Sequence, residues 1–457
     1  MAIATINPTT GITEQEFAPH TDAEVDERIE RAHTAYRVLK GTDYATRAGW
    51  MHAAADLLTA EVDELAALVT TEMGKTIGQA RAEVLKSANN MRFYADRAEE
   101  FLSGRELDAG AVGASRAYTR YQPLGVVLAV MPWNYPIWQV IRFAAPALMA
   151  GNTVLLKHAS NVPQAALYLD GLFGRAGYPS GSFVSLLIPA SGVERVLRDR
   201  RVVAATLTGS EPAGRAVAAV AGSEVKHVVL ELGGSDPFIV LPSADLDAAV
   251  ATAVTSRTTN NGQACINAKR FIVHADVYDA FLERFTAAMA ALVVGDPRDE
   301  ATDIGPVATA SGREELHELV SDAVGKGATA TVGGEPIDGP GWFYQPTVLT
   351  GITQQMRLYA EEAFGPVASV YRVDSAAEAL EIANDTTFGL SSAVWTNDPE
   401  EEELVVAGLE AGAVFVNGMS ISYPEVPFGG VKDSGVGREL SVEGIREFVN
   451  TKSVWRG

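Results

Sequence analysis

The only cysteine of the chain, Cys265, has neighbours that suit a reactive thiol. It follows the segment NNGQA at 260–264, where a glycine flanked by amide side chains is typical of a loop whose backbone N–H groups point at a reacting atom. Because the thiolate is the nucleophilic form of cysteine, a catalytic thiol requires such a setting. The alternative is a small buried apolar residue, which is a common role for an unpaired cysteine.

Two other side chains could assist a reactive thiol. Glu231 follows the strand-like run His227–Leu230 and precedes two glycines, so its carboxylate could face a cleft and act as a general base. Asn134 lies between Pro132 and Pro136, which fix the backbone, and its amide could donate to a developing oxyanion. The alternatives are a solvated turn residue for Glu231 and an ordinary turn for Asn134.

The segment GSEPAG at 209–214 is a candidate phosphate-binding turn. It follows a strand-like run, and Pro212 suits the first turn of a helix. Free N–H groups and the helix dipole make such a turn a binding place for the phosphates of a dinucleotide. The G-x-G-x-x-G pattern is absent, so Gly209 and Gly214 alone are weak evidence for a cofactor.

The composition limits the class of protein. The 457 residues are 47% hydrophobic and 21% charged, which indicates a folded chain of about two or three domains rather than a disordered one. The net charge of -22 argues against nucleic acid and anionic membranes as partners. One cysteine excludes an intramolecular disulfide and a cysteine-rich zinc site, and we predict no metal.

No targeting or membrane segment is expected. The first residues lack the basic and apolar regions of a signal peptide. Prolines, asparagines and an arginine interrupt the most apolar stretch, Gly125–Leu156, which is therefore too broken for a membrane helix. We expect a cytoplasmic protein.

The pattern of apolar residues predicts an α/β fold. Thr21 and Glu24 have the spacing of a capping box before a helix, and a second helical region is expected at about 46–72. From residue 125 onwards, short strand-like runs alternate with helical stretches, which indicates parallel sheets. These runs are Val126–Val130, Thr153–Leu156, Phe183–Leu187, Val202–Leu207, His227–Leu230, Pro237–Leu241, Phe271–His274, Ala368–Val373, Ser392–Trp395 and Ala413–Asn417. The polar segment at about 104–122 fits a projecting β-hairpin, with a surface loop as the alternative.

Seven segments occur in the order expected of one enzyme family. They are MPWNYP at 131–136, Lys157 after a strand, TGS at 208–210, ELGG at 231–234, GQAC at 262–265, EEAFGP at 361–366 and PFGGVKDSG at 427–435. Together they resemble the aldehyde dehydrogenase superfamily over nearly the whole chain, and the spacing between Glu231 and Cys265 also fits. The run at 138–160 resembles the bacterial succinate-semialdehyde dehydrogenase branch.

The resemblance implies a domain arrangement and an assembly. A Rossmann-type NAD(P)-binding domain is expected at 1–231, interrupted by the hairpin arm, followed by an α/β catalytic domain at 232–437. A C-terminal oligomerisation tail is expected at 438–457. Its segment 448–454 looks like an edge strand that would add to a partner's sheet, in a homodimer or homotetramer.

The resemblance also assigns a mechanism. Cys265 matches the nucleophile, Asn134 the oxyanion donor together with the Cys265 N–H, and Glu231 the base. In the implied reaction the thiolate attacks an aldehyde, hydride passes to the nicotinamide, and Glu231 activates the water that hydrolyses the thioester. The presence of that base disfavours transfer of the acyl group to CoA.

The cofactor site is likewise implied by the resemblance. Its expected contacts are Trp133, Lys157, Ser160, Gly209, Ser210, Glu362 and Phe364. Ser160 stands where NAD-preferring relatives place a glutamate, three residues after the lysine, whose carboxylate repels a 2′-phosphate. We therefore predict NADP as the preferred cofactor. The alternative is that Ser160 is neutral and that NAD binds as well.

The substrate prediction depends on one arginine. Arg142 is a lone charge in an apolar stretch, so it needs either an internal carboxylate or the carboxylate of a substrate as its partner. In succinate-semialdehyde dehydrogenases an arginine at this place and a serine five residues before PFGG, here Ser422, bind the distal carboxylate. A further arginine of some relatives is Thr259 here, and Arg257 is offset by two residues. Phe428 matches a residue lining the substrate tunnel. Succinate semialdehyde is favoured, with glutarate semialdehyde or another aldehyde as alternatives.

The residues at and after the nucleophile give two further expectations. A non-catalytic binding or structural protein on the same fold would be expected to have lost Cys265, Glu231 or Asn134, and all three are present. Ile266 and Asn267 follow the nucleophile where some relatives carry a second cysteine. We therefore predict no intramolecular redox switch, although direct oxidation of the thiol is chemically open.

Overall fold

The computed structural model describes residues 2–457, and its N-terminal part is mainly helical. A short hairpin of β1 (Ile3–Ile6) and β2 (Thr13–Phe17) precedes α1 (Asp22–Leu39). The capping box before α1 is confirmed, since the Thr21 and Glu24 side chains each accept a hydrogen bond from the other residue's backbone N–H. The helical region predicted at about 46–72 consists of α2 (Tyr44–Ala60) and α3 (Val62–Met73), and α4 (Ile77–Phe101) follows.

The first sheet has the order β17-β9-β8-β5-β6-β7, and only β17 is antiparallel to its neighbour. Its strands are β5 (Val126–Met131), β6 (Thr153–His158), β7 (Phe183–Ser185), β8 (Val202–Thr208), β9 (His227–Glu231) and β17 (Gly435–Val436). The connecting helices are α5 (Trp138–Ala150), α6 (Pro163–Arg175), α7 (Val193–Arg198) and α8 (Glu211–Ser223). The chain leaves β5 on one side towards β7 and returns to β8 on the other side. The carboxyl ends of β5 and β8 therefore form a topological switch point, where ligands bind in such sheets.

The second sheet has the order β12-β13-β14-β11-β10-β15-β16, with only β12 antiparallel. Its strands are β10 (Asp236–Val240), β11 (Ala268–His274), β12 (Thr329–Val332), β13 (Thr347–Thr350), β14 (Val367–Val373), β15 (Ser392–Trp395) and β16 (Val414–Val416). The remaining longer helices are α9 (Leu246–Thr258), α10 (Ala275–Ala290), α11 (Ala310–Gly325), α13 (Ala376–Asn384) and α14 (Pro399–Gly408). The two sheets confirm the predicted α/β fold.

The predicted domain limits remain a prediction, but the chain passes between the sheets where they would place the boundary. β9 of the first sheet ends at Glu231, and β10 of the second sheet begins at Asp236. The chain then returns to the first sheet with β17, shortly before α15 (Ser441–Arg446). The carboxyl end of β9 thus leads directly to the amino end of β10.

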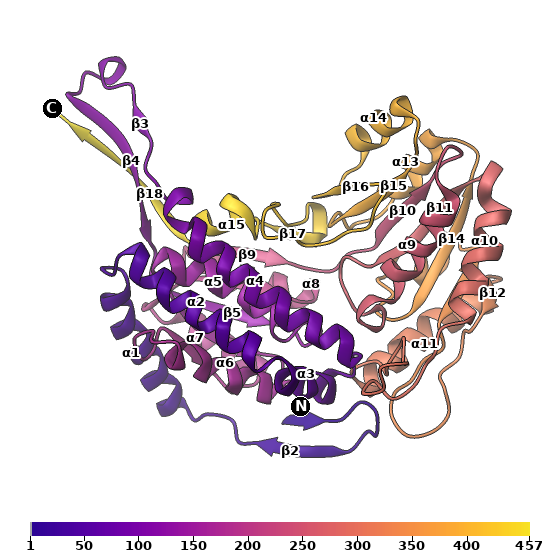
Figure 1. Cartoon of the computed structure of the whole chain (residues 1–457), viewed down its shortest axis with the longest axis horizontal. Helices are drawn as coiled ribbons and strands as arrows, with labels where there is room; N and C mark the ends of the chain where they lie inside the picture. Colours follow the sequence, from indigo (N-terminus) through magenta and orange to yellow (C-terminus); the bar gives the residue numbers. More distant parts are fainter. Residues whose placement is uncertain (1) are drawn as a thin grey trace.

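A three-stranded arm projects from one end of the molecule, and the second sheet lies towards the other end (Figure 1). It consists of β3 (Glu106–Leu107), β4 (Arg116–Pro123) and β18 (Val449–Arg456). The tail pairs with β4 of its own chain along its whole length, from Val449 opposite Pro123 to Arg456 opposite Arg116. β4 therefore occupies one edge of the tail within the chain, and pairing of the other edge with a partner's sheet stays a prediction.

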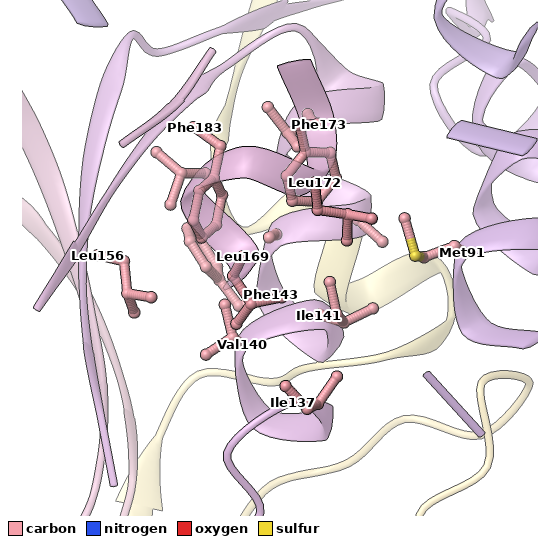
Figure 2. Packing of buried hydrophobic residues seen from close by; sticks show 14 of the residues in the cluster. Met91, Ile137, Val140, Ile141, Phe143, Leu156, Leu169, Leu172, Phe173 and Phe183 are labelled. Atoms are coloured by element: carbon pink, nitrogen blue, oxygen red, sulfur yellow. The ribbon is translucent and has the colours of Figure 1, made fainter. Parts of the chain in front are cut away.

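Helix α5 is the centre of the largest core, and all thirteen of its residues are buried. Figure 2 shows Val140, Ile141 and Phe143 of α5 among side chains of α4, α6 and the first sheet. A helix that is buried on all sides must be mainly apolar, which explains the long apolar stretch around it. Among residues 2–457, none of the helices combines the length and apolarity needed to cross a membrane. Because α5 follows Asn134 closely, this packing fixes the backbone of the predicted catalytic loop.

Candidate active site

Cys265 lies on a turn just before β11, behind a tightly constrained loop. Asn260, Asn261 and Gly262 have φ angles of 59°, 56° and 75°, a left-handed run that asparagine and glycine tolerate best. At Gly262 a Cβ atom would lie 2.4 Å from the carbonyl carbon of Gly365, so no larger residue fits. The amide of Asn261 donates to backbone oxygens of Gly74 and Pro306, at 2.8 and 3.0 Å. The NNG sequence therefore encodes this loop shape.

Asn134 is attached to the same loop. Its Nδ2 donates to the carbonyl oxygen of Gln263 at 3.0 Å, and Asn260 Nδ2 donates to the Asn134 and Gln263 carbonyl oxygens, both at 2.9 Å. An amide nitrogen carries two hydrogens, so one N–H of Asn134 remains for a ligand. Within residues 2–457, the backbone N–H of Cys265 has no hydrogen-bond acceptor. These two donors are available to an oxyanion beside the sulfur.

The surroundings of the Cys265 thiol favour its protonated form. Its burial raises the pKa of Cys265 to about 12. The nearby cations Lys269 and Arg142 lower that pKa in part, whereas the carboxyls of Glu362 and Asp236 raise it. The nucleophile must therefore lose its proton to a base during the reaction.

Glu231 ends β9 and is 2% exposed. Neither of its carboxyl oxygens has a hydrogen-bond partner among residues 2–457. Burial raises the pKa of Glu231 well above its ordinary value, the carboxyl of Glu439 adds to this, and Arg142 and Arg438 oppose it. At Gly429 a Cβ atom would lie 2.8 Å from Glu231 Oε1, so the glycine leaves room for this carboxyl. A buried carboxyl without fixed partners can accept a proton from water.

Two adjoining cavities, the smaller of which is lined by Cys265, contain all the predicted cofactor residues. One of about 540 Å³ is lined by Trp133, Lys157, Ser160, Glu362 and Phe364, among others. An adjoining one of about 320 Å³ shares Trp133, Glu362 and Phe364, and is also lined by Gly209, Ser210, Asn134 and Cys265. The rings of Trp133 and Phe364 meet edge to face, with centroids 5.7 Å apart.

The residues around these cavities fit a dinucleotide. Ser210 precedes α8, and no side chain caps that end, so the first N–H groups of the helix are available to phosphate. A Cβ atom at Gly214 would lie 2.5 Å from Leu232 Cδ2, so the glycine allows α8 to pack closely on the chain after β9. The side chain of Lys157 at the end of β6 supplies positive charge within the larger cavity.

Lys269 is a site residue that the sequence reading missed. Its Nζ lies 2.9 Å from Glu362 Oε1 and donates to the carbonyl oxygens of Ala264 and Cys265, at 3.0 and 2.5 Å. Lys269 thus joins the loop of the nucleophile to the carboxylate of the cofactor cavity. A buried lysine in the strand-like run AKRFIVH was the signal that could have indicated it.

The comparison with known proteins agrees with this arrangement. The sequence profile of the Aldehyde dehydrogenase family matches residues 1–454. The chain belongs to this family. A succinate-semialdehyde dehydrogenase [NADP(+)] from Mycolicibacterium paratuberculosis is 63% identical over all of this chain and 97% of its own length. One from Mycobacterium ulcerans is 61% identical over the full length of both chains.

The solved structure of a related enzyme matches the fold of this aldehyde dehydrogenase. The succinic semialdehyde dehydrogenase of Streptococcus pyogenes, in complex with NADP+, aligns with a TM-score of 0.96 and 39% identity. The match covers 99% of each chain. The family and the fold predicted from the sequence motifs are therefore confirmed.

The structure gives Arg142 an internal carboxylate as its partner, which is one of the two partners expected from the sequence. Arg142, 2% exposed, forms an ion pair with Glu439, which is 4% exposed. The Arg142 guanidinium also donates to Thr208 Oγ1 at 3.2 Å and lies 4.8 Å from the centre of the Phe428 ring. Backbone hydrogen bonds of 2.7 Å in both directions join Phe428 to Glu439. The structure thus favours the internal partner for Arg142, and a role of Arg142 in binding a substrate carboxylate stays a prediction.

Replacing Arg142 by methionine should destabilise the fold. The change leaves the Glu439 carboxyl buried without its cation, which costs about 3–5 kcal/mol. The double variant Arg142→Met/Glu439→Leu should recover most of this loss, because the unpaired charge is removed as well. Denaturant titration of both variants measures the difference. A single variant as stable as the wild type would contradict the structural role.

Ser422 and Thr259 line a separate cavity of about 250 Å³, which also contains Tyr135 and Ile266, the neighbours of Asn134 and Cys265. Arg257 does not reach it, since its guanidinium donates to the carbonyl oxygens of Ala268, Gly262 and Gly365.

Proposed function

We propose that this aldehyde dehydrogenase oxidises succinate semialdehyde to succinate with NADP. The observation that carries the proposal is a pair of cavities on either side of the nucleophile. Cys265 lines the first, its neighbour Ile266 lines the second, and the two cavities share no lining residue. The first fits the cofactor. The second contains Ser422, at the place where related enzymes bind the distal carboxylate. The relative named succinate-semialdehyde dehydrogenase [NADP(+)], which is 63% identical to this chain, supports the choice of substrate and cofactor.

The residues of the site fit a two-stage reaction. The Cys265 sulfur bonds to the aldehyde carbon, its proton leaves to a base, and the resulting oxyanion accepts hydrogen bonds from Asn134 Nδ2 and the Cys265 N–H. When bound, NADP supplies the acceptor for the hydride that leaves this carbon. A thioester on Cys265 remains. Glu231 then takes a proton from water as the water oxygen bonds to the acyl carbon, and the C–S bond breaks to release the acid.

The proposal is tested by following reduced-cofactor absorbance with succinate semialdehyde, glutarate semialdehyde and butanal, each with NADP and NAD. We expect kcat/KM for succinate semialdehyde to exceed that for butanal about 100-fold, which corresponds to one charge-assisted contact. A higher value for glutarate semialdehyde would transfer the assignment to that substrate. An enzyme that prefers butanal would contradict a carboxylate-bearing substrate.

Ser160→Glu should change the cofactor preference. Ser160 lines the larger cavity, and a carboxylate at this position would repel the 2′-phosphate of NADP. We expect kcat/KM for NADP to fall about 100-fold, while that for NAD changes little. The matched control is Ser160→Ala, which removes the hydroxyl without adding charge. Equal use of NADP by wild type and Ser160→Glu would show that Ser160 does not set the preference.

The assembly and location belong to the same proposal. The outer edge of β18 pairs with no strand among residues 2–457, and Trp455 on it is 59% exposed. An unpaired edge beside an exposed aromatic ring supports a contact with another subunit, in a homodimer or homotetramer. The cytoplasmic location remains a prediction.

A further inference from the structure

The cavity next to Ile266 contains a cation that the proposed chemistry does not yet use. Helix α4 contributes Gln79, Ala82, Glu83 and Lys86 to its wall, and the segment 419–422 contributes the opposing residues up to Ser422. Glu83 is already engaged: its carboxylate pairs with Lys75 and accepts the N–H groups of Ile137 and Trp138, at 2.8 and 3.0 Å. Lys86 therefore remains as the charged lining group without a fixed role.

The ammonium group of Lys86 is held in place but only partly satisfied. It donates to Ser422 Oγ at 2.7 Å and lies 4.1 Å from the centre of the Trp138 ring. In residues 2–457, no carboxylate lies within salt-bridge distance of it. An ammonium has three donors, so two remain besides the hydrogen bond to Ser422. Lys86 is half-buried, so its ammonium can be reached from the cavity by an anion that enters it.

The more deeply buried cations near this cavity differ from the half-buried Lys86 in having a carboxylate partner. Lys75 pairs with Glu83, Arg142 pairs with Glu439, and Lys269 pairs with Glu362. Each of these cations is 2% exposed or less, and each has its own carboxylate. The missing anion for Lys86 would have to enter the cavity from outside.

We propose that Lys86, together with Ser422, binds the distal carboxylate of the substrate and so determines the preference for a semialdehyde. This inference rests on the proposed function and deepens it. Ser422 was predicted for that task, and the structure joins it to Lys86 rather than to Arg142. The cavity wall formed by Tyr135 and Ile266, next in sequence to Asn134 and Cys265, connects this carboxylate site to the reacting carbon.

The charges around Lys86 support the assignment. Burial lowers the pKa of Lys86 to about 7; Arg142 and Lys75 act in the same direction, and Glu83 and Cys265 oppose them. A carboxylate bound at the ammonium would favour its charged form and raise this pKa. Near neutral pH, binding of the anion would thus be coupled to uptake of a proton by Lys86.

Lys86→Met tests the inference in the full-length enzyme with NADP. Methionine preserves most of the side-chain volume and removes the charge. We expect kcat/KM for succinate semialdehyde to fall about 100-fold, mainly through KM, while kcat/KM for butanal stays within about threefold. Inhibition by succinate should weaken to a similar extent. Ser422→Ala should give a smaller loss, about fivefold to tenfold, because one neutral hydrogen bond is removed.

The controls separate charge, folding and function. Lys40→Met removes an exposed lysine that does not line the cavity and should leave kcat/KM for both aldehydes unchanged. The Lys86 inference is overturned if wild type prefers succinate semialdehyde and Lys86→Met keeps that preference, or if both aldehydes lose activity equally. If wild type itself shows no preference for a carboxylate-bearing aldehyde, the proposed function fails first and the inference fails with it.

Discussion

We expect Cys265→Ser to abolish aldehyde oxidation, with kcat/KM falling at least about 10⁴-fold. A serine hydroxyl is a much weaker nucleophile than a thiolate, and the buried position that raises the thiol pKa also disfavours an alkoxide. The measurement is NADP-dependent oxidation of succinate semialdehyde under steady-state conditions. Serine fits the same space, so the loop of Asn260, Asn261 and Gly262 should keep its shape.

The control for this variant is cofactor binding. Trp133 lies in both cofactor cavities, so its fluorescence should still respond to NADPH in Cys265→Ser. Loss of activity with retained NADPH binding identifies the nucleophile. If oxidation continued at a tenth of the wild-type rate or more, a covalent reaction on Cys265 would be excluded.

We expect Glu231→Gln to stop the reaction after its first half. We expect a burst of about one reduced cofactor per active site, followed by turnover about 10³-fold slower than wild type, because no base is left to activate water. Intact-mass spectrometry of the protein after the burst should show the acyl group on Cys265. Glutamine preserves the shape of a side chain whose oxygens have no protein partner in residues 2–457.

The matched control for Glu231→Gln is Glu443→Gln, which makes the same exchange at an exposed position. It should show neither the burst nor the slow phase. A Glu231→Gln enzyme that loses the burst as well would place Glu231 in the first half of the reaction, where it would accept the thiol proton.

The pH profile follows from the same carboxyl. Because the pKa of Glu231 is raised, the group is protonated at low pH and becomes a base only as the pH rises through that value. Wild-type turnover should therefore increase with pH when hydrolysis of the thioester limits it. The slow phase of Glu231→Gln should lack that dependence.

Local patterns were enough to predict the elements that carry the chemistry. The strand-like runs before Asn134, Ser210 and Glu231 are β5, β8 and β9, and their carboxyl ends lie together because the strands are parallel. Each of these signals spans only a few residues of sequence. The short strands β12 and β13 were not predicted, since neither contains more than two consecutive apolar residues.

The partners of buried charges could not be predicted in the same way. The apolar neighbours of Arg142 in the sequence indicate that it needs an anionic partner. They do not identify Glu439, which comes close to Arg142 only because the chain returns to the first sheet. Lys86 was not recognised, because a lysine on a helix is ordinarily solvated and its partner Ser422 is 336 residues away. Such pairings depend on tertiary packing rather than on local propensity.

The return of the C-terminal segment to the first sheet has a consequence for folding. β17 covers the edge of β9, β18 covers β4, and Glu439 neutralises Arg142, so all three contacts need the segment 435–456 in place. Until this segment docks, the folding chain has an open strand edge beside Glu231 and an unpaired buried cation. The carboxyl end of β9, where Glu231 lies, is therefore completed by a segment about 200 residues later in the sequence.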